Sequence, residues 1–214
     1  MKQANIPAWV PHPVWSFCAK VLSFVINPNF CQFFIYVYLR NTSHAGLISM
    51  SLLFLAAIPL AGYVLYVRYG LKRDNLYVLE RSKRYIPFFI NIISVITFVY
   101  LMNTTFVGGG KNIDAMDSLA DFLLFINGLT LIITMFWRIS IHMIAASASM
   151  ALLMFEDTGI VLSILNCLLF LILFLVGWSR WYLRGHTVSQ IIGGAILGFS
   201  ITLLFLKYKF MMGL

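Results

Sequence analysis

Short polar links divide this chain into apolar runs, several of them about 20 residues long, the length at which a helix crosses a bilayer core about 30 Å thick. A transmembrane barrel would alternate apolar and polar residues, and these runs do not alternate. We therefore expect an all-α fold, a polytopic transmembrane helical bundle with six or seven spans. The runs cover residues 14–39, 46–67, 85–106, 118–137, 143–155, 160–178 and 191–206.

Composition agrees with a membrane protein, since 61% of the 214 residues are hydrophobic, only 10% are charged and the mean hydropathy is +0.92. The formal net charge of +8 favours anionic headgroups and phosphate as neighbours, although basic residues also act as ordinary topology signals. We expect membrane lipids and a lipid phosphate as partners, and no nucleic acid. The three cysteines have neither metal-ligand spacing nor the even number of a disulfide framework.

The first apolar run is interrupted by Asn27-Pro28-Asn29. Proline removes a backbone donor and asparagine favours a turn, so this run is either a kinked span or an interfacial helix followed by a short re-entrant piece. We divide the chain accordingly into an N-terminal interfacial or kinked membrane segment, residues 1–45, and a membrane-embedded helical domain, residues 46–214. In the last run, Gly194 and Gly198 have the spacing that permits close helix packing.

Three polar links, residues 68–84, 138–142 and 179–187, each follow an even-numbered run and therefore emerge on the same side of the bilayer. Arginine suits phosphate because its planar fork donates two parallel hydrogen bonds, and imidazole adds a nucleophile and a proton donor. Ionisable groups at membrane depth are costly and usually mark a functional site. These links, together with Gln190, supply Lys72, Arg73, Arg81, Lys83, Arg84, Arg138, Ser140, His142, Ser179, Arg180, Arg184, His186 and Thr187.

Each of these elements also has an ordinary interpretation. A basic loop beside a span is a common topology determinant, and Ser140 could simply cap the helix that begins there. A single histidine at a helix end is often no more than a satisfied polar group. The occurrence of all three elements in order, on one side, is what favours a site.

In that order the residues resemble the type 2 phosphatidic acid phosphatase superfamily, whose helical core is shared with vanadium-dependent haloperoxidases. The third motif of that family, Ser-Arg-x5-His-x3-Asp, is matched by Ser179, Arg180 and His186, with Gln190 in place of the aspartate. The second motif, Pro-Ser-Gly-His, is matched by Ser140 and the histidine two residues later, with isoleucines in place of proline and glycine.

The first motif of the family, a lysine followed seven residues later by Arg-Pro, is the poorest match. Residues 81–87 contain the cations Arg81, Lys83 and Arg84, but proline falls three residues after Arg84 and Tyr77 stands at the lysine position. The resemblance covers about residues 46–207. It implies an acid phosphatase/vanadium haloperoxidase-like core.

The resemblance further implies a metal-independent lipid phosphate phosphatase without a cofactor. His186 would attack phosphorus to form a phosphohistidine, and His142 would protonate the leaving group and then activate water. In a helix Gln190 lies four residues after His186, so its amide oxygen can accept the Nδ1–H bond. The groups that would hold the phosphate are Arg84, Lys83, Arg81, Ser140, Ser179 and Arg180.

Two alternative functions stay open. The first is a catalytically weak or inactive protein that binds a phospholipid headgroup, because the amide of Gln190 cannot stabilise an imidazolium as a carboxylate would. The second is a lipid phosphotransferase. A transporter or channel is disfavoured because no span carries a charge at its middle. The candidate substrates are phosphatidate, phosphatidylglycerol phosphate, undecaprenyl diphosphate and lipid A phosphate. We expect a multi-pass protein of the bacterial cytoplasmic membrane, and leave open its oligomeric state and the side on which the site lies.

Overall fold

The computed structural model describes residues 12–40, 45–71, 83, 85–105, 113–156 and 164–212, and all regular structure within these ranges is helical. The predicted all-α fold is therefore confirmed. In chain order the elements are α1 (Pro13–Val25), α2 (Pro28–Arg40), α3 (Ala45–Ser51), the π-helical η1 (Leu52–Ala57), α4 (Ile58–Leu65), the π-helical η2 (Tyr66–Gly70), α5 (Tyr85–Thr105), α6 (Ile113–Phe136), α7 (Ile141–Glu156), α8 (Ile164–Tyr182) and α9 (Val188–Met212).

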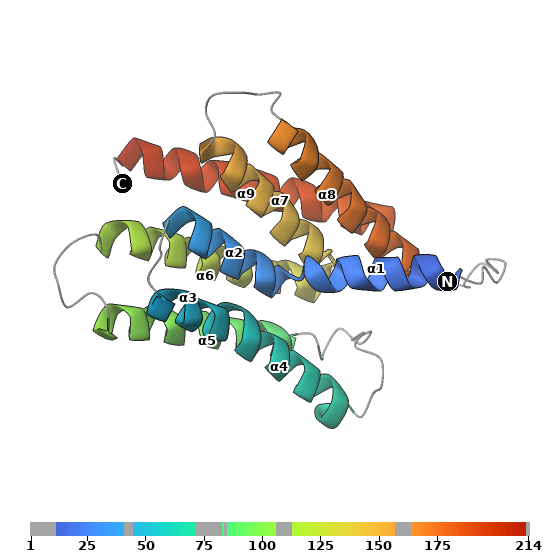
Figure 1. Cartoon of the computed structure of the whole chain (residues 1–214), viewed down its shortest axis with the longest axis horizontal. Helices are drawn as coiled ribbons and strands as arrows, with labels where there is room; N and C mark the ends of the chain where they lie inside the picture. Colours follow the sequence, from blue (N-terminus) through green and yellow to red (C-terminus); the bar gives the residue numbers. More distant parts are fainter. Residues whose placement is uncertain are drawn as a thin grey trace.

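Helices α1 and α2 run through the middle of the molecule, with α3, α4 and α5 on one side and α7, α8 and α9 on the other (Figure 1). Helix α2 packs against both η1 and α7, and α1 packs along α8. The ring of Trp15 in α1 meets that of Trp178 in α8 edge to face, with centroids 6.1 Å apart. The N-terminal segment is thus part of the bundle and not a separate layer.

The break between α1 and α2 falls at the proline that the sequence singles out. Residues Pro13–Val25 and Pro28–Val37 meet at a bend of 45°. The side chain of Asn27 stabilises the break, because its Oδ1 accepts a hydrogen bond from the Asn29 N–H at 3.0 Å. This geometry fits either a broken span or a re-entrant loop, the two alternatives that the sequence leaves open.

Three helical segments are long and apolar enough to cross a membrane, namely Ala45–Gly70, Tyr85–Met102 and Val188–Tyr208, and the bent α1–α2 pair raises this number to four at most. The remaining apolar helices in the described part of the chain are shorter: Asp121–Phe136, Ile141–Met154 and Asn166–Tyr182. A 14-residue segment rises only about 21 Å, less than the bilayer core. The prediction of six or seven spans is therefore not confirmed.

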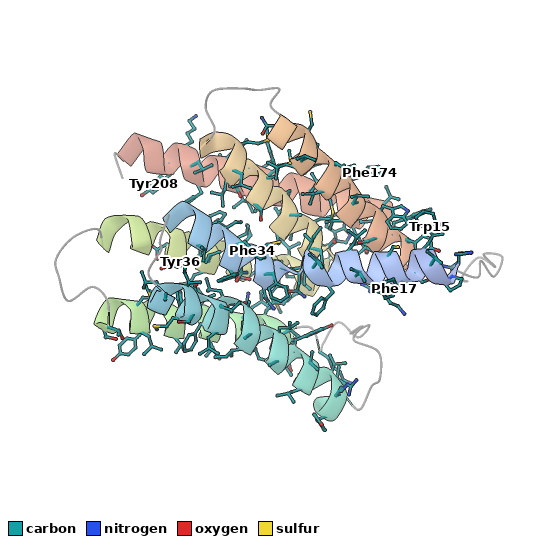
Figure 2. All side chains as sticks on the ribbon, viewed as in Figure 1. Trp15, Phe17, Phe34, Tyr36, Phe174 and Tyr208 are labelled. Carbon is teal, nitrogen blue, oxygen red and sulfur yellow. The ribbon has the colours of Figure 1, made fainter. Side chains whose placement is uncertain are left out.

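The outer surface of the helices is strongly apolar. Large hydrophobic side chains are exposed on several helices, among them Phe17, Phe34 and Phe174, each more than 60% exposed (Figure 2). Tyr36, by contrast, is buried, and its ring meets that of Phe98 at 4.9 Å between α2 and α5. An apolar exterior around a packed interior is the pattern expected of helices that face lipid.

Helices α7 and α9 pack closely because α9 presents glycines to α7. A Cβ added at Gly194 would stand 2.7 Å from the Ser140 backbone oxygen, and one added at Gly198 would collide with the Ile144 backbone oxygen and the Ser147 side chain. The packing role predicted for these two glycines is confirmed. This contact matters for function because α7 and α9 begin with the two histidine-bearing motifs.

Candidate active site

A cavity of about 200 Å³ lies where α5 and α7 begin and where α6 and α8 end. The turn between α1 and α2 and one face of α4 complete its wall. The described residues that line it are Asn27, Pro28, Asn29, Pro59, Tyr63, Pro87, Phe88, Asn91, Asn127, Thr134, Arg138, Ile139, Ile141, His142, Arg180 and His186. Its size accommodates a phosphate group with several water molecules.

The cavity brings together the two predicted catalytic histidines. His142 lies in the first turn of α7 and His186 lies in the link between α8 and α9, yet both line the same wall. Arg180, at the end of α8, interacts electrostatically with both imidazoles, and Arg138 does so with His186. Two imidazoles and two guanidinium groups therefore share one cavity, and they come from two of the three predicted links, 138–142 and 179–187.

The orientation of His186 is set by Gln190. Gln190 Oε1 lies 3.1 Å from the Thr187 N–H, which can only donate, so this atom is an acceptor and the amide orientation is fixed. The same oxygen lies 3.3 Å from His186 Nδ1, and that nitrogen must therefore carry the proton. The contact expected from the four-residue spacing is present, and in the neutral ring it places the lone pair on Nε2.

Burial and charge together keep His186 neutral. Burial, together with the positive charges of Arg180 and Arg138, lowers the pKa of its imidazole from 6.5 to about 4. The hydrogen bonds to Gln190 and to the Arg138 backbone oppose this lowering only in part. At neutral pH the ring is therefore uncharged.

Helix α8 continues to Tyr182, so Ser179 and Arg180 lie in its last turn and not in a link beginning at residue 179. The apolar run predicts that this helix ends at residue 178, four residues too early. The reason is that polar residues begin within the last helical turn, before the helix ends at Tyr182. Ser179 is fully buried and its Oγ donates to the Val176 backbone oxygen at 2.8 Å, so it does not line the cavity.

A left-handed residue closes the C-terminus of α8. Arg184 has φ 52°, its N–H donates to the Trp181 oxygen at 2.9 Å, and the Gly185 N–H donates to the Arg180 oxygen at 3.0 Å. These two bonds form a Schellman motif, in which glycine normally occupies the position of Arg184. A Cβ at Gly185 would stand 3.0 Å from Arg180 Nη2. Position 185 must therefore be glycine or a similarly small residue for the Arg180 guanidinium to keep its place beside it.

His142 is held by a residue that the sequence reasoning missed. Its Nε2 lies 3.2 Å from the Ser23 backbone oxygen and 3.5 Å from Ser23 Oγ, and Arg180 Nη1 donates to the same Oγ at 2.7 Å. Because a backbone oxygen can only accept, Nε2 of His142 carries a proton and Nδ1 is the atom free to exchange one. Ser23 sits in an apolar helix with no motif around it, and nothing in the sequence indicates this role.

Ser140 immediately precedes α7, and its backbone N–H donates to the Gln190 backbone oxygen at 3.3 Å, which ties the link 137–140 to the first turn of α9. Its side chain is fully buried, and Oγ has no hydrogen-bond partner among the described residues. The interpretation of Ser140 as a capping side chain therefore fails. A buried hydroxyl without a partner is unusual in a folded protein.

The predicted cations of the first link are only partly described. The backbone oxygen of Lys83 accepts a hydrogen bond from the Tyr66 hydroxyl at 3.1 Å, and Lys83 is not among the residues that line the cavity. Arg81 and Arg84 lie outside the described residues. Within the described part of the chain, no group of three or more His, Cys, Asp or Glu side chains is placed to hold a metal ion.

Comparison with protein families gives one match. Residues 130–213 match the model of the PAP2 superfamily. This segment contains the end of α6 and the whole of α7, α8 and α9, and so both histidine-bearing motifs. No match to the chain is found among curated proteins or among solved structures.

Proposed function

Since residues 130–213 match the model of the PAP2 superfamily, we propose that this chain is a member of that superfamily and an integral-membrane phosphatase that hydrolyses a lipid phosphate or diphosphate monoester. The observation that carries this proposal is the meeting of His142, His186 and Arg180 at one cavity near the ends of four helices. A headgroup at the membrane surface can reach such a position while its acyl chains remain in lipid.

His186 is the nucleophile in this proposal. Its Nε2 lone pair forms a bond to phosphorus while the bond from phosphorus to the alcohol oxygen breaks. The proton stays on Nδ1 throughout and is donated in a hydrogen bond to the Gln190 amide oxygen, which holds the ring in position. The positive charge that develops on the ring is offset by the negative charge of the phosphoryl group.

His142 exchanges protons with the leaving group and with water. In its charged form it gives the Nδ1 proton to the departing alkoxide, or to the departing phosphate of a diphosphate ester, and becomes neutral. Water then attacks phosphorus, its proton passes to Nδ1 of His142, and the bond between phosphorus and His186 breaks to release inorganic phosphate. Ser23 holds the opposite nitrogen of His142 during both steps.

Positive charge around the phosphoryl group stabilises the transition state. Arg138 and Arg180 line the cavity and supply fixed charge with preorganised donors. Ser140 is fully buried and is not among the lining residues, but its Oγ has no partner among the described residues, and we propose that this hydroxyl also binds the phosphoryl oxygens. Arg84, Lys83 and Arg81 are proposed to complete this set from the first link, as the family pattern implies.

The test is phosphate release from phosphatidate, phosphatidylglycerol phosphate, undecaprenyl diphosphate and lipid A phosphate by purified protein in detergent. At least one substrate should be hydrolysed without added metal, and His186→Ala or His142→Ala should each lower kcat by about a thousandfold or more. His12→Ala is the matched control, because His12 is exposed and does not line the cavity. Activity that survives both cavity substitutions contradicts the proposal.

A second candidate function is favoured by Gln190, whose amide cannot neutralise an imidazolium. In this case the same cavity binds a phospholipid headgroup without turnover. Retention of lipid by the purified protein, no phosphate release from the four substrates, and no labelled phosphohistidine after acid-free quenching would together support it.

A further inference from the structure

Three buried amides form a cluster at the inner end of the cavity. Gln32 of α2 and Asn91 of α5 are each 8% exposed, and Asn127 of α6 is 6% exposed. Asn91 Nδ2 donates to Asn127 Oδ1 at 2.7 Å, Gln32 Nε2 donates to the same oxygen at 3.5 Å, and Asn127 Nδ2 donates to the Leu123 backbone oxygen at 2.7 Å.

The orientation of all three amides follows from these bonds. The Leu123 oxygen can only accept, so the nitrogen of Asn127 must face it and the oxygen of Asn127 must face the other two side chains. Asn91 and Gln32 must then both present their nitrogens to that oxygen. Their own oxygens, Oδ1 and Oε1, are left over as acceptors, and neither receives a hydrogen bond from a described residue.

One of these acceptors, Asn91 Oδ1, belongs to a residue that lines the cavity containing the histidines, whereas Gln32 is not among the lining residues. Asn91 and Asn127 line it directly, as does Thr134, which is 6% exposed and whose Oγ1 also has no partner among the described residues. Asn127 lies two helical turns before Thr134 along α6, so the amide cluster lies about 10 Å deeper in the bundle. The cavity therefore has a cationic outer end and an acceptor-rich inner end.

Packing between helices does not explain the inner end. Buried amides often join helices inside membranes, but the two N–H bonds to Asn127 already do this. Leaving a buried amide oxygen without a donor destabilises the protein, so the unpartnered Asn91 Oδ1 at the cavity lining indicates a ligand that donates.

The charge of the lining restricts what that ligand is. An anion is disfavoured at the inner end because the unpartnered amide oxygen of Asn91 can only accept a hydrogen bond. A cationic amine is disfavoured because the described lining contains Arg138 and Arg180 and no Asp or Glu. Uncharged hydroxyl groups remain.

We propose that Asn91 and Thr134 form a subsite for hydroxyl groups of the alcohol part of the substrate. The substrate is then a phosphate ester whose alcohol carries further free hydroxyls, as in a polyol or sugar phosphate. This inference rests on the proposed function, because the phosphate of such an ester must lie at His186. A lipid-linked polyol phosphate and a free one share this chemistry.

The test uses two matched pairs of esters. Glycerol 1-phosphate is compared with propyl phosphate, which lacks the two hydroxyls, and phosphatidylglycerol phosphate is compared with phosphatidate. Wild-type protein should favour the hydroxyl-bearing member of at least one pair by about tenfold in kcat/KM, the value of one or two hydrogen bonds. A preference confined to the second pair identifies the lipid-linked source, and one confined to the first identifies the free source.

Two variants then locate the preference. Asn91→Leu and the isosteric Thr134→Val should each reduce the ratio within the favoured pair several-fold, while Asn166→Leu, the same change at a buried asparagine outside the cavity, should retain it. Thr134→Val decides the matter if Asn91→Leu does not fold. Equal use of both members of each pair, or a preference that both variants retain, overturns the subsite.

Binding separates this inference from the phosphatase itself. The dissociation constants of glycerol 1-phosphate and propyl phosphate are measured by calorimetry with the His186→Ala variant. This measurement needs no turnover. If the variant binds glycerol 1-phosphate more tightly but the wild type hydrolyses no ester, the subsite is supported and the phosphatase proposal is contradicted. If the wild type hydrolyses the esters but no preference is seen, the phosphatase proposal is supported and the subsite is contradicted.

Discussion

At the scale of single residues, the partner of His186 is an amide where the family pattern has a carboxylate. Gln190 fixes the tautomer of the ring through a hydrogen bond of 3.3 Å, but it adds no negative charge. Burial and the positive charges of two arginines therefore determine the pKa of His186, which falls from 6.5 to about 4. In the proposed reaction, a ring that stays neutral can attack phosphorus over a wide range of pH.

The pH profile should reflect this. The acid limb of kcat/KM, which reports the free enzyme, should lie well below pH 6.5, because His186 stays neutral until the pH approaches 4. In Gln190→Glu the added carboxylate favours the imidazolium, so this limb should move to higher pH. The measurement is initial rate from pH 3.5 to 8 for both proteins with one substrate, whose own ionisation is common to the two profiles. Superimposable acid limbs would be inconsistent with the assignment of His186.

The same shift affects folding. Since the pKa of His186 is lower in the folded protein than in the unfolded chain, the unfolded chain binds more protons between about pH 4 and 6.5. The contribution of His186 to stability is thus complete above pH 6.5 and is lost as the pH falls toward 4.

Ser23 offers a second test among single residues. Its hydroxyl accepts from Arg180 at 2.7 Å, so Ser23→Ala should loosen the guanidinium and lower kcat/KM about three- to tenfold, the value of one such bond. His142 should keep its contact with the backbone oxygen, so the effect should stay far below that of His142→Ala. Ser16→Ala, on the same helix, is the control. An unchanged rate in Ser23→Ala would show that this hydroxyl does not position Arg180.

At the scale of elements, the site depends on how closely α9 approaches α7. The first turn of α9 carries Gln190, whose backbone oxygen accepts the Ser140 N–H just before α7 begins. Any side chain at Gly194 or Gly198 would separate the two helices. By setting the distance between α7 and α9, the two glycines also set the position of His142 relative to His186.

Gly198→Ala should therefore destabilise the protein by about 1–3 kcal/mol, as overpacking commonly does, and lower its melting temperature in detergent. Gly128→Ala is the matched control, because a Cβ there meets nothing within 4 Å and alanine is the better helix former. A melting temperature for Gly198→Ala at or above that of Gly128→Ala would contradict the close packing of α7 and α9.

At the scale of the whole molecule, the residues that line the cavity come from more of the chain than the segment that matches the family model. Residues 130–213 provide the histidines and Arg180, but the turn between α1 and α2, together with α4 and α5, provides much of the remaining wall. A chain reduced to residues 41–214 should lose at least tenfold in kcat/KM, because Ser23 and the Asn27–Asn29 turn leave the site. Phosphate release and a melting curve for both chains would check this, and wild-type activity without the first 40 residues would exclude a role for α1.

The sequence predicts those parts of the site that lie within short, recognisable spacings. His142, His186 and their common cavity follow from counting apolar runs, and the bond from His186 to Gln190 follows from helical periodicity. Contacts across the fold do not follow: Ser23 is 119 residues from His142 and has no motif around it. The buried amides are single polar residues in apolar runs, and only packing shows that three of them meet.

The length of α1 is therefore as important as its composition. The atom that holds His142 is the backbone oxygen of Ser23, and every amino acid supplies the same atom. Substitution at this position leaves that oxygen where it is, whereas one residue inserted earlier in the helix would turn it by about 100°. In variants of this protein, insertions and deletions between Pro13 and Ser23 should be tolerated far less than substitutions.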